Sequence, residues 1–154
     1  MKCFISAILL FFSLSVFSQN KSFSKVIALT SKADTVYFVA DNSGCFHAYI
    51  LEMKMCKQKN GDRRLIIKGE NGIEQKDLSS KNYQAFIKNY NASVQHFIKV
   101  GQGKCTSTSE FELMCKNKNG SVNSTKFKNS TCEAEYNPEM FLQNLFRASE
   151  PTKK

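Results

Sequence analysis

Residues 60–102, NGDRRLIIKGENGIEQKDLSSKNYQAFIKNYNASVQHFIKVGQ, decide the fold because the spacing of their apolar residues changes once, near Leu78. Before that point the chain is extended and is interrupted by two Asn-Gly pairs, Asn60-Gly61 and Asn71-Gly72. An Asn-Gly pair between extended runs is the strongest short-range indication of a β-hairpin. The sequence therefore predicts a three-stranded antiparallel meander, with strands over residues 45–57, 63–68 and 73–76.

Beyond Leu78 the apolar residues recur at steps of three and four, which is typical of a helix with one buried face. Ser79 or Ser80 can cap the start of this helix, and Gly101 is expected to end it. The predicted stripe of buried residues is Tyr83, Phe86, Ile87, Tyr90, Val94, Phe97 and Ile98.

A second extended pair and a second helix follow. Asn119-Gly120 separates the extended run 106–116 from the run 122–128, which predicts another hairpin. Asn137-Pro138 then opens a short helix, with Asn as the cap and Pro in the first turn. The apolar residues of this helix are Phe141, Leu142, Leu145 and Phe146.

A shift of 59 residues superimposes residues 56–61 on residues 115–120, which indicates two strand–strand–helix halves. The halves disagree in one respect. Cys115 shares a strand face with Phe111 and Leu113, whereas Cys56 lies opposite the face that carries Leu51, Met53 and Met55. Either a β-bulge reconciles the two halves, or the similarity is a consequence of a Lys- and Asn-rich composition.

Two shorter extended runs, Lys25 to Thr30 and Thr35 to Ala40, are interpreted as strands, and Asp41 to Gly44 as a loop. Because strands dominate, we expect an α+β fold, an antiparallel sheet with two helices packed on one face. The other face would be exposed or covered by the N-terminal hairpin. We expect one domain over residues 25–148 and a frayed tail over residues 149–154.

The first residues resemble a secretory signal peptide, because Lys2 supplies a positive charge and Cys3 to Phe17 is an uncharged, mostly apolar run. That run is shorter than the roughly twenty residues that a membrane-spanning helix needs. Cleavage is predicted after Ser18, which leaves residues 19–24 as a polar leader. An uncleaved membrane anchor is the alternative. We expect a secreted or periplasmic protein with no later membrane-spanning segment.

The chain is basic, and removal of Lys2 with the signal peptide lowers its formal net charge from +9 to +8. The basic residues are mostly Lys and are scattered among acidic residues, whereas nucleic-acid binding favours a basic stripe rich in Arg and aromatic residues. We therefore expect a protein or an anionic extracellular ligand as the partner, and no nucleic acid.

Five of the six cysteines follow the predicted cleavage point, and in an exported chain they are candidates for disulfides. Cys105 and Cys132 lie near the open end of the second predicted hairpin and form the first candidate pair. Cys56 and Cys115 are equivalent under the 59-residue shift and form the second. Cys45 is then left as a free thiol.

Cys45 and His47 would point to the same side of a strand, a spacing that suits a thiol activated by imidazole or part of a metal site. No motif supplies an orienting group or an oxyanion hole, so we interpret Cys45 as a structural cysteine beside a strand histidine. His96 is expected to be a partly exposed helix residue. No catalytic, cofactor-binding or metal-binding residue is assigned, and no cofactor is expected.

Several short motifs together resemble small exported proteins of unknown function from Bacteroidetes. The motifs are Ser43-Gly44-Cys45-Phe46-His47, Leu78-Ser79, Gly103-Lys104-Cys105-Thr106 and Ser130-Thr131-Cys132. The resemblance covers most of residues 35–147. It implies an exported protein and a shared fold, and it brings no catalytic residues with it.

Three functions are compatible with these features. The first is a non-enzymatic protein- or ligand-binding module of the inhibitor or immunity type, which export, small size and the absence of catalytic motifs favour. The second is a small secreted thiol enzyme or hydrolase that uses Cys45 and His47. The third is a secreted surface or adhesion protein that binds anionic glycans through its lysines.

Overall fold

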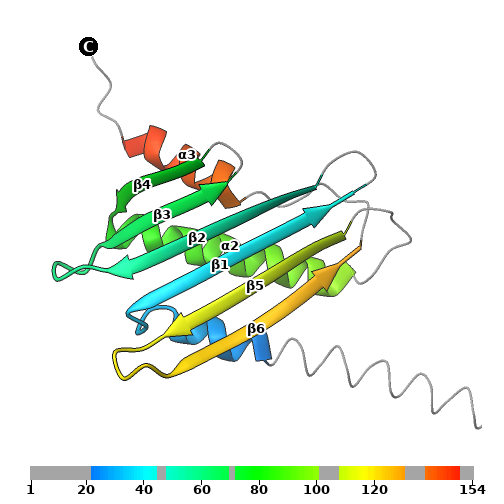
Figure 1. Ribbon diagram of the computed structural model, residues 1–154, viewed down its shortest axis with the longest axis horizontal. Helices are drawn as coiled ribbons and strands as arrows, with labels where there is room; N and C mark the ends of the chain where they lie inside the picture. The colour runs from blue at the N-terminus through cyan, green and yellow to red at the C-terminus, as the bar shows by residue number, and fades with distance from the viewer. Residues whose placement is uncertain (1–21, 45–47, 70–71, 101–107, 131–137, 150–154) are drawn as a thin grey trace, which may run out of the picture.

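The computed structural model describes residues 22–44, 48–69, 72–100, 108–130 and 138–149. Six strands form one open antiparallel sheet in the order β4-β3-β2-β1-β5-β6 (Figure 1). They are β1 (Thr35–Ser43), β2 (Ala48–Lys57), β3 (Arg63–Gly69), β4 (Gly72–Leu78), β5 (Thr108–Lys116) and β6 (Val122–Asn129). The helices are an N-terminal helix over residues 22–29, α2 (Ser80–Val100) and α3 (Pro138–Ser149). The predicted α+β class is confirmed, with one helix more than expected.

The central strand β1 pairs antiparallel with two hairpins that are distant from each other in the sequence. On one edge Thr35 lies opposite Cys56 of β2, and on the other it lies opposite Lys116 of β5. Both pairings continue without interruption to Ser43. The hairpins β2–β3 and β5–β6 therefore flank β1 with their turns at the same end of the sheet (Figure 1).

The two hairpin turns have the same backbone geometry, as their Asn-Gly pairs predict. Gly61 and Gly120 have positive φ values of 90° and 83°, a conformation that glycine adopts without steric cost. In the first turn the amide of Gln58 donates to the carbonyl of Asp62, and in the second Asn117 donates to Ser121 in the same way. The 59-residue similarity thus corresponds to two equivalent turns.

The 59-residue similarity does not extend to the faces of the strands. Cys115 is buried under the helices, whereas Cys56 lies on the opposite face of the sheet and is partly exposed. The uninterrupted pairing of β2 and β5 with β1 excludes the bulge that would have reconciled them. The first half also contains an additional strand, β4, before its helix.

The core lies between the sheet and the helices, all of which cover the same face (Figure 1). Phe38 of β1 is at its centre, with edge-to-face contacts to Phe86 and Tyr90 of α2 at ring-centroid distances of 4.9 Å each. The stripe predicted for α2 is buried, except that Ile87 is only partly buried. The hydroxyl of Ser79 accepts a hydrogen bond from the amide of Asn82, so Ser79 is the cap.

The N-terminal segment is a helix and not the predicted strand, so the expectation for residues 25–30 was wrong. Residues 22–24, which we assigned to the polar leader, form the first turn of this helix. Phe23 and Val26 are one turn apart and both enter the core, where the Phe23 ring lies 6.1 Å from that of Tyr90. Packing on α2 therefore overrides the strand preference of the β-branched residues in this segment.

The predicted loop at residues 41–44 is also wrong for its first three residues, which extend β1. Asn42 pairs with Tyr49 on one side and with Ser109 on the other, and the Ser43 and Thr108 hydroxyls are 2.7 Å apart. Pairing on both edges outweighs the turn preference of the Asp-Asn-Ser sequence.

A buried arginine fixes the segment that leads into β1. Arg63 is 2% exposed; its Nη2 donates to the Thr30 carbonyl at 2.9 Å, and the hydroxyl of Tyr83 donates to the same oxygen. The guanidinium also lies over the Tyr83 ring at 4.3 Å. Desolvation raises the pKa of Tyr83 to about 12, so its hydroxyl stays protonated as a donor.

Replacement of Phe86 by Ala should strongly destabilise the protein, because Phe86 is fully buried against Phe38. We expect a loss of about 3–5 kcal/mol in the free energy of unfolding. Lys88→Ala, on the exposed face of the same helix, should change it by less than about 0.5 kcal/mol. Urea denaturation of both variants measures the difference, and equal losses would contradict the assignment of the buried face.

Candidate functional site

The face of the sheet opposite the helices is uncovered by any described element, and we call it the open face. The alternation of β1 and its neighbours places Tyr37 on this face between Lys54 of β2 and Met114 of β5. Val39 follows on the same face, between Glu52 and Glu112. The N-terminal segment does not cover this face, because its helix packs on the other side of the sheet.

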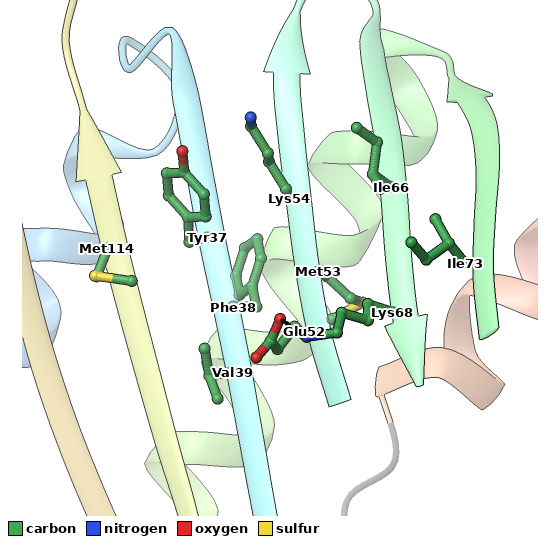
Figure 2. Close-up of a pocket in the computed structure, with 10 residues that line it drawn as sticks. All are labelled: Tyr37, Phe38, Val39, Glu52, Met53, Lys54, Ile66, Lys68, Ile73 and Met114. Atoms are coloured by element: carbon green, nitrogen blue, oxygen red, sulfur yellow. Dashed lines mark hydrogen bonds and ion pairs between the residues drawn. The ribbon is translucent and has the colours of Figure 1, made fainter. Parts of the chain in front are cut away.

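A shallow, half-open hollow of about 360 Å³ lies in the centre of the open face. Its side chains come from five neighbouring strands, from Met114 of β5 to Ile73 of β4 (Figure 2). Apolar groups form most of it, and Ile73 is 73% exposed. The side chains that line it from the open face are Tyr37, Val39, Glu52, Lys54, Ile66, Lys68, Ile73 and Met114.

Oppositely charged residues pair within and beside this hollow. Lys68 contacts Glu52 at 3.3 Å, and Arg64 contacts Asp77 at 3.2 Å. On the other side of β1, Lys126 of β6 contacts two carboxylates of β5, that of Glu112 at 3.0 Å and that of Glu110 at 3.5 Å. Hydrogen bonding to Glu112 and its negative charge raise the pKa of Lys126. The charges in and beside the hollow are therefore mostly balanced by partners, and the remaining ammonium group, that of Lys54, lies 5.8 Å from the centre of the Tyr37 ring.

The predicted pair Cys56–Cys115 is wrong, because both thiols are free. Cys56 lies opposite Thr35, and Cys115 lies opposite Val36, on strands that β1 separates. Two strand spacings amount to about 10 Å, whereas a disulfide requires Cα atoms less than about 7 Å apart. The two side chains also point to opposite faces of the sheet.

The other sequence-derived candidates mostly lie outside the described residues. These are Cys45, Cys105, Cys132 and His47. The Cys105–Cys132 pairing and the free Cys45 thiol remain predictions. His96 is on the exposed side of α2, as expected, with its ring 6.0 Å from that of Phe97.

The hollow itself was missed from the sequence. Its apolar members occupy outward positions on β1, β3, β4 and β5, where polar residues alternate with the core. One signal was present in the sequence of β1. Its buried face carries Val36, Phe38 and Ala40, and Tyr37 and Val39 alternate with them, so the strand has apolar residues on both faces. Only the strand order brings Tyr37 next to Met114 and places Ile66 on the same face, one strand beyond Lys54.

Comparison with protein families, with curated proteins and with solved structures finds no match for this chain. Among the described residues, no three His, Cys, Asp or Glu side chains are grouped so that they could hold a metal ion. None of the described helices combines the length and apolar content that crossing a membrane requires.

The two described thiols should differ sharply in reactivity. Burial raises the pKa of the Cys115 thiol to about 11, so at pH 8 only roughly one molecule in a thousand carries the reactive thiolate. Cys56 is partly exposed on the open face. N-ethylmaleimide at pH 8 should therefore modify Cys56 in the native protein and Cys115 only after unfolding.

Peptide mapping without reduction measures both labels and also tests the Cys105–Cys132 pair. Native labelling of Cys115 at the rate of Cys56 would contradict its burial. A Cys105–Cys45 bond would contradict the predicted pairing.

Proposed function

We propose that this chain is an exported, non-catalytic binding module that docks a protein partner on its open face. One observation carries the proposal: no described element covers the largely apolar hollow on the face of the six-stranded sheet opposite its helices. Contiguous apolar surface surrounded by polar residues is typical of protein–protein contact sites.

The arrangement of the open face favours a protein over a small molecule. Apolar side chains such as Tyr37, Met114 and Ile73 form most of the lining, and charged side chains of β2 and β3 stand between them, a mixture that protein interfaces share. Most charges in and beside the hollow already pair with one another, so docking does not require a partner with a strong charge of one sign. The hollow is half-open, and a small ligand in it would stay largely in contact with water.

Export is supported by the first eighteen residues, whose pattern of one Lys and an apolar run is that of a signal peptide. A binding module outside the cytoplasm, of the inhibitor or immunity type, fits both features. The thiol-enzyme alternative depends on Cys45 and His47, and no described side chain supports it.

Polar substitutions on the open face should weaken capture of the partner. We would immobilise the mature protein, its Tyr37→Ser variant and its Ile73→Gln variant, and identify retained proteins from the producing organism's extracellular or periplasmic fraction by mass spectrometry. The matched control is Met140→Gln on α3, which removes another exposed apolar side chain.

We expect the parent and the control to retain the partner equally. The open-face variants should retain at least about fivefold less of it, because interface tyrosines often contribute more than 1 kcal/mol to the binding free energy. Unchanged thermal unfolding of each variant shows that the fold is intact. Equal retention by all four proteins would overturn the open face as the binding surface.

A further inference from the structure

A second hollow, of about 610 Å³, lies between the two hairpin turns at the end of the sheet where β1 begins. Figure 1 shows these turns side by side, with the segment before β1 between them. We call it the turn hollow. It is lined by Lys32, Asp34, Lys57, Gln58, Lys59, Asn117, Lys118 and Asn119.

The backbone holds this hollow in a fixed shape. The amide of Asp34 donates to the carbonyl of Lys116 at 3.1 Å, and the amide of Lys57 donates to the carbonyl of Asp34 at 2.8 Å. Residue 34 is therefore bonded to both hairpins at once. Ala33 beside it is completely buried, which fixes the base of the hollow to the core.

The charge in the turn hollow is one-sided, in contrast to the open face. Four lysines line it and one carboxylate opposes them. None of the four forms an ion pair with another described residue, whereas Lys68 in the apolar hollow and Lys126 beside it pair with acids. An excess of lysines over carboxylates produces a positive potential that attracts anions.

The neutral lining residues indicate what kind of anion fits. Asn117 Nδ2 donates to the Ser121 hydroxyl, and Asn119 Oδ1 accepts hydrogen bonds from Ser121. Oδ1 of Asn117 and Nδ2 of Asn119 are thus left for a ligand. Gln58 adds a third side-chain amide to the lining. Amides and a carboxylate are suited to hydrogen-bond sugar hydroxyls.

We propose that the turn hollow binds an acidic glycan, with the lysines on its sulfate or carboxylate groups and the amides on its hydroxyls. Its lining contains no aromatic side chain, on which the bases of a single-stranded nucleic acid would stack. It also contains no apolar side chain that could enter a lipid bilayer. The site is separate from the open face and does not depend on the proposed protein partner.

Isothermal titration of the mature protein with dextran sulfate oligomers tests this site, and unsulfated dextran of the same length serves as the neutral ligand. The variant Lys59→Gln/Lys118→Gln removes one lysine from each turn. The control Lys81→Gln/Lys88→Gln removes the same charge from the exposed side of α2. Hydrogen bonds to charged groups contribute enough that we expect the turn variant to bind dextran sulfate at least about tenfold more weakly.

The control should bind dextran sulfate within about twofold of the parent, and unsulfated dextran should not bind. Equal weakening of both variants would overturn the proposal, because it would mean that net charge alone attracts the polymer. The proposal would also be overturned if oligodeoxythymidylate, or vesicles containing phosphatidylglycerol, bound as tightly as dextran sulfate and lost binding in the Lys59→Gln/Lys118→Gln variant. Ile73→Gln should leave dextran sulfate binding unchanged, which keeps this result distinct from the test of the open face.

Discussion

The antiparallel pairing of β1 on both of its edges is the constraint on which the rest of the structure depends. It joins β2 and β5, which are about fifty residues apart in the sequence, into one sheet. The same strand supplies Phe38 to the ring cluster under α2 and Tyr37 to the open face. A one-residue slip of β1 would exchange these faces, so both the core and the apolar hollow depend on this register.

The register also explains why two surfaces of different chemistry occur on one small sheet. In the middle of the sheet, side chains from neighbouring strands lie opposite one another, and acids pair with bases between β2 and β3 and between β5 and β6. At the start of β1 the strands end in turns, so the lysines there project without partners from neighbouring strands. The buried contact of Arg63 with the Thr30 carbonyl holds the intervening segment in place.

Local sequence was sufficient for the turns and for α2, and insufficient where tertiary contacts decide. Gly61 and Gly120 adopt the positive φ that their Asn-Gly pairs predict. The face of α2 follows from the spacing of Phe86 and Tyr90. The N-terminal helix, in contrast, contains β-branched and aromatic residues that favour strands, and the contact of Phe23 with Tyr90 cannot be predicted before the chain is folded. The length of β1 was underestimated for the same reason, because its last residues are held by partners on both sides.

Of the two proposed binding surfaces, only the turn hollow has a basis in local sequence, namely its two Asn-Gly turns. The open face needs the strand order, since nothing in the sequence places Met114 beside Tyr37. The pairing of Cys56 with Cys115 failed because the 59-residue similarity belongs to the turns and not to the strands, which differ by one residue in their register with β1. That same similarity puts Lys59 and Lys118 at equivalent positions of two equivalent turns. β1 sets those two turns side by side. The 59-residue similarity, which led to a wrong disulfide prediction, therefore explains why lysines from both hairpins line one hollow.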